Sequence, residues 1–185
     1  VLFRSIIDSI SKRYSCCGAR IGTVSTKNKK VFDNMLKLAQ SRLSVATLEQ
    51  VGAAALNKVP LSYFDKTLNE YKHRKELIFK KLSEMEGVVY TNPEGAFYTI
   101  VKLPVDDAEK FIIWTLENIS IDGETILLTP AKDFYLTEGR GINEVRIAYC
   151  VDRDKIERGM EILKLALKKY PNNTLLKIKE NSKTI

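Results

Sequence analysis

The residues best suited to chemistry lie together in a short polar segment, residues 9–22, which follows an apolar, strand-like run. Lys12 is a candidate nucleophile, because a neutral lysine amine attacks aldehydes to form an imine. The hydroxyls of Ser9 and Ser11 can donate hydrogen bonds to phosphate oxygens, and Arg20 can bind a phosphate through two parallel hydrogen bonds. Ligands of α/β folds bind beyond the carboxyl ends of strands, and this segment occupies such a position.

A lysine for an aldehyde beside a set of phosphate-binding side chains is the combination that holds pyridoxal 5′-phosphate. The same residues also suit a solvated basic loop, and their chemistry alone leaves both interpretations open. The chain has three cysteines, of which Cys16 and Cys17 are neighbours. They give neither a disulfide framework nor the spacing of a zinc site, so no bound metal is expected.

Residues 9–22 follow the pattern S-x-S-K-x5-G-x-R-x-G. This pattern resembles the cofactor-lysine signature of class I aminotransferases, which are pyridoxal-phosphate enzymes of the aspartate aminotransferase fold. The resemblance implies that Lys12 forms a Schiff base with the cofactor and is the catalytic residue. It also implies that Ser9, Ser11 and Arg20 hold the cofactor phosphate.

The resemblance continues to about residue 171 and includes a second motif, N-E-V-R-I-A-Y, at residues 143–149. This motif is similar to the family's strand whose arginine binds the substrate α-carboxylate, which implies that role for Arg146. A cation between two apolar residues of a strand needs an anionic partner. The alternative is an ordinary salt bridge, for example to Glu144 or Asp152.

The resemblance further implies transamination between an amino acid and a 2-oxo acid, with Lys12 moving the proton of the substrate Cα. Arg42 lies where dicarboxylate-specific members place an arginine that reaches the neighbouring subunit's active site. That position implies a homodimer and the substrates aspartate or glutamate with 2-oxoglutarate or oxaloacetate. The alternatives are a solvated helix-end arginine, an aminotransferase for aromatic or neutral amino acids, and a pyridoxal-phosphate lyase on the same fold.

The elements that must position these residues predict an α/β chain, and the resemblance implies that it is the C-terminal portion of a fold-type-I pyridoxal-phosphate-dependent transferase. Residues 1–45 would end the large cofactor-binding domain, and residues 46–86 would form interdomain helices. Residues 87–171 would form a small α+β domain, and residues 172–185 a loose tail. We expect a fragment without the N-terminal half of the enzyme and with little activity of its own.

Local patterns predict several boundaries in the small domain. Residues 125–128 and 144–150 are β-rich and predict strands. Asp106 is the expected cap of one helix, and Asp152 of the last, which Pro171 ends.

Composition narrows the class of protein. Apolar residues make up 44% of the chain and charged residues 29%, which excludes a disordered chain. The net charge of +7 arises within residues 1–46, which leaves a nucleic-acid-binding module as a distant alternative. No aromatic platform or recognition helix accompanies these charges, so we expect no nucleic-acid partner. We also expect a cytoplasmic protein without a membrane partner, because no apolar run approaches roughly 20 residues.

Overall fold

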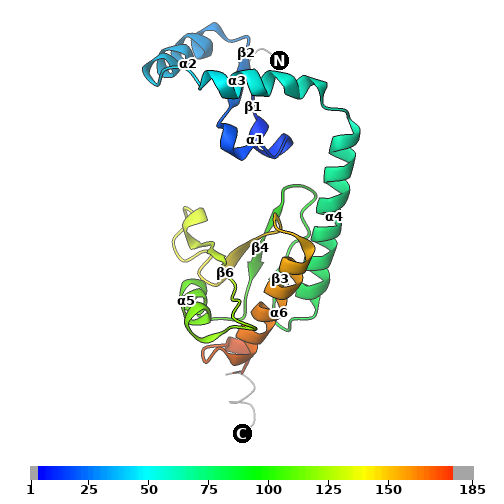
Figure 1. The fold of residues 1–185 in the computed structure, drawn as a ribbon. Helices are drawn as coiled ribbons and strands as arrows, with labels where there is room; N and C mark the ends of the chain where they lie inside the picture. The colour runs from blue at the N-terminus through cyan, green and yellow to red at the C-terminus, as the bar shows by residue number, and fades with distance from the viewer. Residues whose placement is uncertain (1–3, 177–185) are drawn as a thin grey trace. The chain divides into compact units, whose positions relative to one another are not determined.

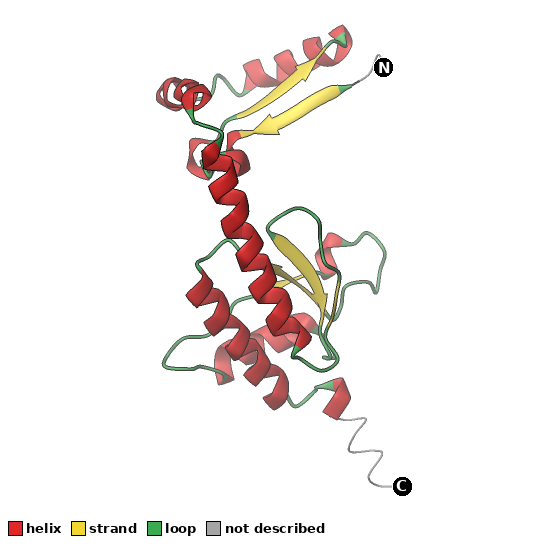
Figure 2. Ribbon diagram, turned by 90° about the vertical axis from the view of Figure 1, so that its right-hand side faces the viewer, coloured by secondary structure: helices red, strands yellow, loops and turns green. Residues whose placement is uncertain are grey.

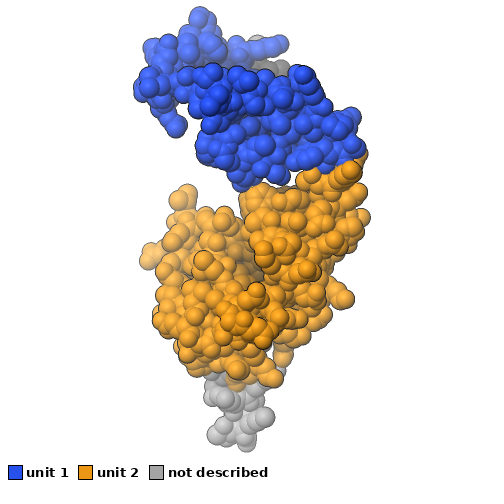
Figure 3. Space-filling model, in the orientation of Figure 1, with its two compact units in different colours: residues 1–64 blue, residues 65–185 orange. Residues whose placement is uncertain are grey.

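A computed structural model describes residues 4–176 of the chain. It divides into two compact units, unit 1 (Val1–Phe64) and unit 2 (Asp65–Ile185), which Figure 3 shows in different colours. The two units have separate sheets, one of two strands and one of four.

Unit 1 is built on an antiparallel hairpin (Figure 1). In its register, Ser9 at the end of the first strand lies opposite Gly22 at the start of the second. Two short helices lie in the connection, and longer helices follow the hairpin. The elements in chain order are β1 (Ser5–Ser9), α1 (Ile10–Arg13), the 3-10 helix η1 (Cys17–Ala19), β2 (Gly22–Thr26), α2 (Lys29–Ser41), α3 (Thr47–Ala54) and the 3-10 helix η2 (Ala55–Lys58).

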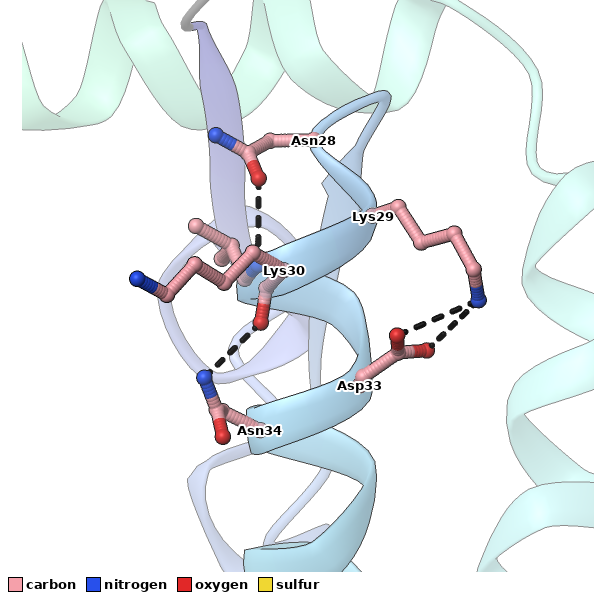
Figure 4. A network of polar contacts seen from close by, with 6 residues as sticks. Asn28, Lys29, Lys30, Asp33 and Asn34 are labelled. Carbon is pink, nitrogen blue, oxygen red and sulfur yellow. Dashed lines mark hydrogen bonds and ion pairs between the residues drawn. The ribbon is translucent and has the colours of Figure 1, made fainter.

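Polar side chains define the start of α2 (Figure 4). The Asn28 side-chain oxygen accepts a hydrogen bond from the backbone N–H of Val31 at 3.2 Å. This bond satisfies one of the N–H groups that the first turn of a helix leaves without a partner. Lys29, the first residue of α2, forms an ion pair at 3.1 Å with Asp33 one turn later. Residues four positions apart lie next to each other on a helix surface.

Unit 2 contains a four-stranded sheet in the order β3-β4-β6-β5, antiparallel throughout (Figure 2). The helix α4 begins at Ser62, three residues before the start of unit 2, and ends at Ser83 within unit 2. The elements are α4 (Ser62–Ser83), β3 (Val89–Tyr90), β4 (Tyr98–Lys102), α5 (Ala108–Asn118), β5 (Thr129–Pro130), the 3-10 helix η3 (Lys132–Phe134), β6 (Glu144–Ala148) and α6 (Arg153–Lys169).

The hydrophobic core lies in unit 2 and follows from the alternation of side chains along the central strands. Val101 of β4 and Val145 and Ile147 of β6 are buried. They belong to one cluster with the apolar faces of the three long helices, represented by Ile78, Leu82, Phe111, Met160 and Leu163. Because side chains alternate across a strand, Arg146 projects to the opposite face of the sheet.

Two local predictions are wrong. Residues 125–128 do not form a strand, and the edge strand β5 has only two residues. Pro130 has no N–H to donate to a ladder, which fits so short an edge strand. The cap of α5 is Asp107, whose carboxylate accepts from two backbone N–H groups. Asp106 instead accepts a hydrogen bond from the Tyr170 hydroxyl at 2.8 Å.

The chain after α6 turns back onto unit 2, so the first residues of the predicted loose tail are packed. Asn173 is 6% exposed, and its amide donates to the carbonyl of Leu167 at 2.8 Å. Residues 177–185 of that predicted tail lie outside the described residues. Within residues 4–176, no helix has the length and apolar character needed to cross a membrane.

Candidate functional site

Lys12 lies in a single helical turn that begins where β1 ends. Ser9 is the last residue of β1 and caps α1, with an extended backbone at φ −149° and ψ 142°. Its Oγ accepts a hydrogen bond from the Ser11 N–H at 3.1 Å. The cap therefore fixes how the strand passes into the turn that carries Lys12, whose side chain is exposed.

A second hydrogen bond of Ser9 ties this turn to the other strand. The Ser9 hydroxyl donates to the Ile21 carbonyl at 3.2 Å, and the Ile10 N–H donates to the same oxygen at 3.3 Å. A serine hydroxyl has one hydrogen, and an ionised phosphate can only accept. Ser9 would therefore have to leave Ile21 in order to donate to a phosphate. The Ser11 hydroxyl makes no hydrogen bond within residues 4–176 and is available to donate.

Arg20 closes the connection before β2. Its backbone is left-handed, with φ 52° and ψ 38°, a conformation that costs a non-glycine residue about 1 kcal/mol. Its guanidinium donates to the carbonyl of Cys17 at 2.9 Å. A guanidinium has five N–H donors, so this contact leaves others for an anion.

The neighbouring cysteines support the same connection. The Cys17 thiol donates to the Ser11 carbonyl at 3.1 Å, and the Cys16 thiol donates to the Tyr14 carbonyl at 3.2 Å. Both are free cysteines. Their hydrogen bonds to these two carbonyls help to hold the turn around Lys12.

Arg146 belongs to unit 2, where the middle of β6 positions it. The register places it opposite Ile100 of β4. Its guanidinium carbon lies 5.4 Å from the centre of the Tyr98 ring and 5.1 Å from the centre of the Phe134 ring. Its Nε is buried and has no hydrogen-bond partner among the described residues.

The salt bridge considered as the alternative for Arg146 is absent among residues 4–176. Glu144 accepts a hydrogen bond from the Tyr135 hydroxyl at 2.5 Å, and Asp152 pairs with Lys155 at 3.2 Å. Arg146 also lines a cavity of about 740 Å³ together with residues 124–129 and α6. A partly buried cation with an unpartnered Nε beside a cavity is suited to bind an anion.

Arg42 lies on another element of unit 1. It follows α2 as the residue that ends the helix, and its backbone N–H donates to the carbonyl of Ala39 at 3.2 Å. Its side chain is exposed. The structure therefore brings Ser9, Ser11, Lys12 and Arg20 together in one connection, and places Arg42 and Arg146 on other elements.

The resemblance implied that residues 93–98 enter the active site, but the sequence did not predict that Tyr98 and Phe134 lie beside Arg146. Tyr98 could have been found, because it pairs with Ala148 and so lies two residues from the Ile100–Arg146 pair on the same face. Phe134 gave no such signal, since it ends the short 3-10 helix η3 and is not paired with the strand that carries Arg146.

Comparisons with known proteins agree on one family. The family model described as aminotransferase class I and II matches residues 4–163. The aspartate aminotransferase of Bacillus subtilis is 28% identical over 89% of this chain and 41% of its own length. The chain thus spans about two fifths of that relative.

Solved structures show the same similarity. The aromatic aminotransferase of Pyrococcus horikoshii matches 89% of this chain and 43% of its own, with a TM-score of 0.75 and 26% identity. The α-aminoadipate aminotransferase LysN of Thermus thermophilus also has a TM-score of 0.75, at 24% identity, over 89% of this chain and 41% of its own. That structure contains N-(5′-phosphopyridoxyl)-L-leucine.

Proposed function

The chain belongs to the class I and II aminotransferase family, and from this membership we propose that the complete protein transfers an amino group from an amino acid to a 2-oxo acid. The observation that carries the proposal is the connection between β1 and β2. It presents one primary amine, Lys12, on a capped turn, together with the Ser11 hydroxyl and the Arg20 guanidinium.

This set of donors fits pyridoxal 5′-phosphate. Lys12 would hold the aldehyde, because aldehydes react with amines. Ser11 and Arg20 would bind the phosphate, because a hydroxyl and a guanidinium both donate hydrogen bonds to phosphate oxygens. Ser9 contributes mainly by shaping the turn, since its hydroxyl is bonded to Ile21. When bound, the cofactor withdraws electrons from the substrate Cα and makes its proton acidic.

The residues of this chain have separate tasks in the reaction. Lys12 takes the proton from the substrate Cα and returns it during amino transfer, acting as base and then as acid. Arg146 binds the substrate α-carboxylate, for which its unpartnered, partly buried guanidinium is suited. Fixing the carboxylate limits the rotation of the amino acid and holds the Cα proton in place.

For the substrate we propose an acidic amino acid, aspartate or glutamate, with Arg42 of a second subunit binding the distal carboxylate in a homodimer. The exposed side chain of Arg42 and the similarity to the aspartate aminotransferase of Bacillus subtilis support this class. An aromatic amino acid is the second candidate, supported by the similarity to the aromatic aminotransferase of Pyrococcus horikoshii.

The test uses the complete protein loaded with pyridoxal phosphate. Lys12→Ala removes both the amine for the aldehyde and the proton carrier, so we expect the visible absorbance of the bound cofactor to disappear and kcat to fall by about 10³-fold or more. Lys29→Ala is the matched control in the same unit, because Lys29 pairs only with Asp33 among the described residues. Retention of either the absorbance or the turnover by Lys12→Ala would contradict the proposal.

The same assay separates the two substrate classes. If Arg42 binds a distal carboxylate, Arg42→Ala lowers kcat/KM for aspartate by about tenfold or more, because it leaves that carboxylate without its charged partner. In the same variant, kcat/KM for a neutral or aromatic donor should change little. If Arg42→Ala leaves the ratio of kcat/KM for aspartate to kcat/KM for an aromatic donor unchanged, Arg42 does not select the substrate.

A further inference from the structure

The Arg146 guanidinium lies between two aromatic rings, both of them about 5 Å from its central carbon. Tyr98 comes from the neighbouring strand β4 and Phe134 from the end of η3. Within residues 4–176, Arg146 has no ion pair, and its buried Nε has no hydrogen bond. The two rings are therefore the contacts that orient this guanidinium.

We propose that Phe134 is a positioning residue for Arg146, a role that rests on the proposed binding of the substrate carboxylate by Arg146. An arginine side chain has several rotatable bonds and loses their entropy when it is held in one geometry. Aromatic contacts attract the cation and need none of its N–H donors. The guanidinium is thus held while its donors remain free for a carboxylate.

The loop that carries Phe134 is held in turn by the next residue. The Tyr135 hydroxyl donates to the Glu144 carboxylate at 2.5 Å, at the start of the strand that carries Arg146. This hydrogen bond, with burial, raises the pKa of Tyr135 above its ordinary value, so the hydroxyl stays protonated and continues to donate. The loop and β6 are therefore joined beside the Phe134–Arg146 contact.

Gly141 makes this arrangement possible. Its backbone has φ +73°, and a Cβ at that position would lie 2.6 Å from the Tyr135 ring. A side chain there would displace the ring and the bond to Glu144. A second anchor is the ion pair between Lys132, the first residue of η3, and Glu109 of α5.

Phe134 is not a core residue. It is 53% exposed, whereas Phe111, which packs in the core, is completely buried. Phe134 therefore contributes little to the folding of unit 2, and a change at this position can be read as an effect on Arg146.

The experiment measures kcat and KM of the complete, cofactor-loaded protein with its best amino donor. Phe134→Leu keeps an apolar side chain and removes the ring, so KM should rise about three- to tenfold with kcat changed less than twofold. Phe134→Tyr keeps the ring and should restore the KM of the unaltered protein. Leu136→Ala is the matched control, because Leu136 lies in the same loop and is fully exposed. The melting temperature should be the same in all of these variants.

A KM unchanged by Phe134→Leu would overturn the proposal, as would a Phe134→Tyr variant as impaired as Phe134→Leu. Tyr135→Phe removes the hydroxyl that donates to Glu144 and should raise KM about two- to fourfold. Arg146→Lys separates this inference from the function on which it rests. It should raise KM at least tenfold, and if it does not, the carboxylate role of Arg146 fails and its positioning by Phe134 fails with it.

Discussion

Unit 1 and unit 2 differ most in what their apolar side chains contact. Every described residue of unit 1 is exposed or half-buried, and Leu43 and Leu48 are more than four-fifths exposed. In unit 2, apolar side chains from α4, α5, α6 and the sheet form one buried cluster. Burial of apolar surface is the main favourable term in folding, so in this chain it stabilises unit 2 more than unit 1.

The residues proposed to act in the reaction are supported differently in the two units. The turn that carries Lys12 is held by hydrogen bonds of Ser9, Arg20 and Cys17, all near solvent. Arg146, in contrast, extends from a strand whose neighbouring residues Val145 and Ile147 are buried. Because exposed hydrogen bonds with few apolar contacts open locally at low free energy, the geometry around Lys12 should be lost more easily than the geometry around Arg146.

The largest expected effect is on the free energy of unfolding when a core side chain is removed. Phe111→Ala removes a completely buried ring, and we expect it to lower the free energy of unfolding of unit 2 by about 3–5 kcal/mol. Phe32→Ala is the matched change in unit 1, where the ring is 53% exposed, and should cost about 0.5 kcal/mol or less. Urea unfolding followed by the fluorescence of Trp114, the chain's one tryptophan, gives the value for unit 2, and circular dichroism of the helices gives the value for unit 1. Equal costs for the two changes would show that unit 1 also has a packed core.

A smaller effect concerns pH and the end of α6. Burial, and next the hydrogen bond to Asp106, raise the pKa of Tyr170 to about 12. Because an unfolded tyrosine titrates near pH 10, this contribution to stability is complete below about pH 10. It is lost as the pH rises toward 12, and amounts to about 2–3 kcal/mol.

Stability measured by urea unfolding at pH 9 and at pH 11 tests this expectation. The unaltered chain should lose more stability between these two values than Tyr170→Phe, which has no ionisable hydroxyl. Trp114 packs edge-on against Tyr170 with ring centres 5.3 Å apart, so its fluorescence reports the same region. Equal losses in the two proteins would contradict a raised pKa.

The sequence predicted the α/β fold and its family, and both are confirmed by the family match and the solved aminotransferase structures. The family was predicted from the resemblance of residues 9–22 and 143–149 to its motifs, and single elements could be predicted because they depend on local spacing. The alternation around Val145 and Ile147 defines β6, and the position of Asp152 defines the start of α6. The roles of Lys12 and of Arg146 stay predictions that the experiments above can test.

The features that could not be predicted depend on contacts between distant residues. Asp106 and Asp107 are equally good caps by sequence, and the choice follows from Tyr170, which lies 64 residues away and bonds Asp106. The strand expected at residues 125–128 failed because β-rich composition does not show which residues find a ladder partner. Phe134 reaches Arg146 through a loop whose shape depends on Tyr135, and no periodic pattern encodes such a loop.

The smallest expected effect on the free energy of unfolding comes from removing a helix cap. One cap in each unit allows a matched comparison. Asp152 caps α6 by accepting from the Lys155 N–H at 3.0 Å, as Asn28 caps α2 by accepting from Val31. Asp152→Ala should lower the free energy of unfolding reported by Trp114 by about 1 kcal/mol, because α6 packs into the core and its cap stabilises the whole cluster. Asn28→Ala should leave that transition unchanged, since no described residue of unit 1 belongs to the core. If Asn28→Ala lowers it equally, the units unfold together and the exposed hydrogen bonds around Lys12 are as stable as the core.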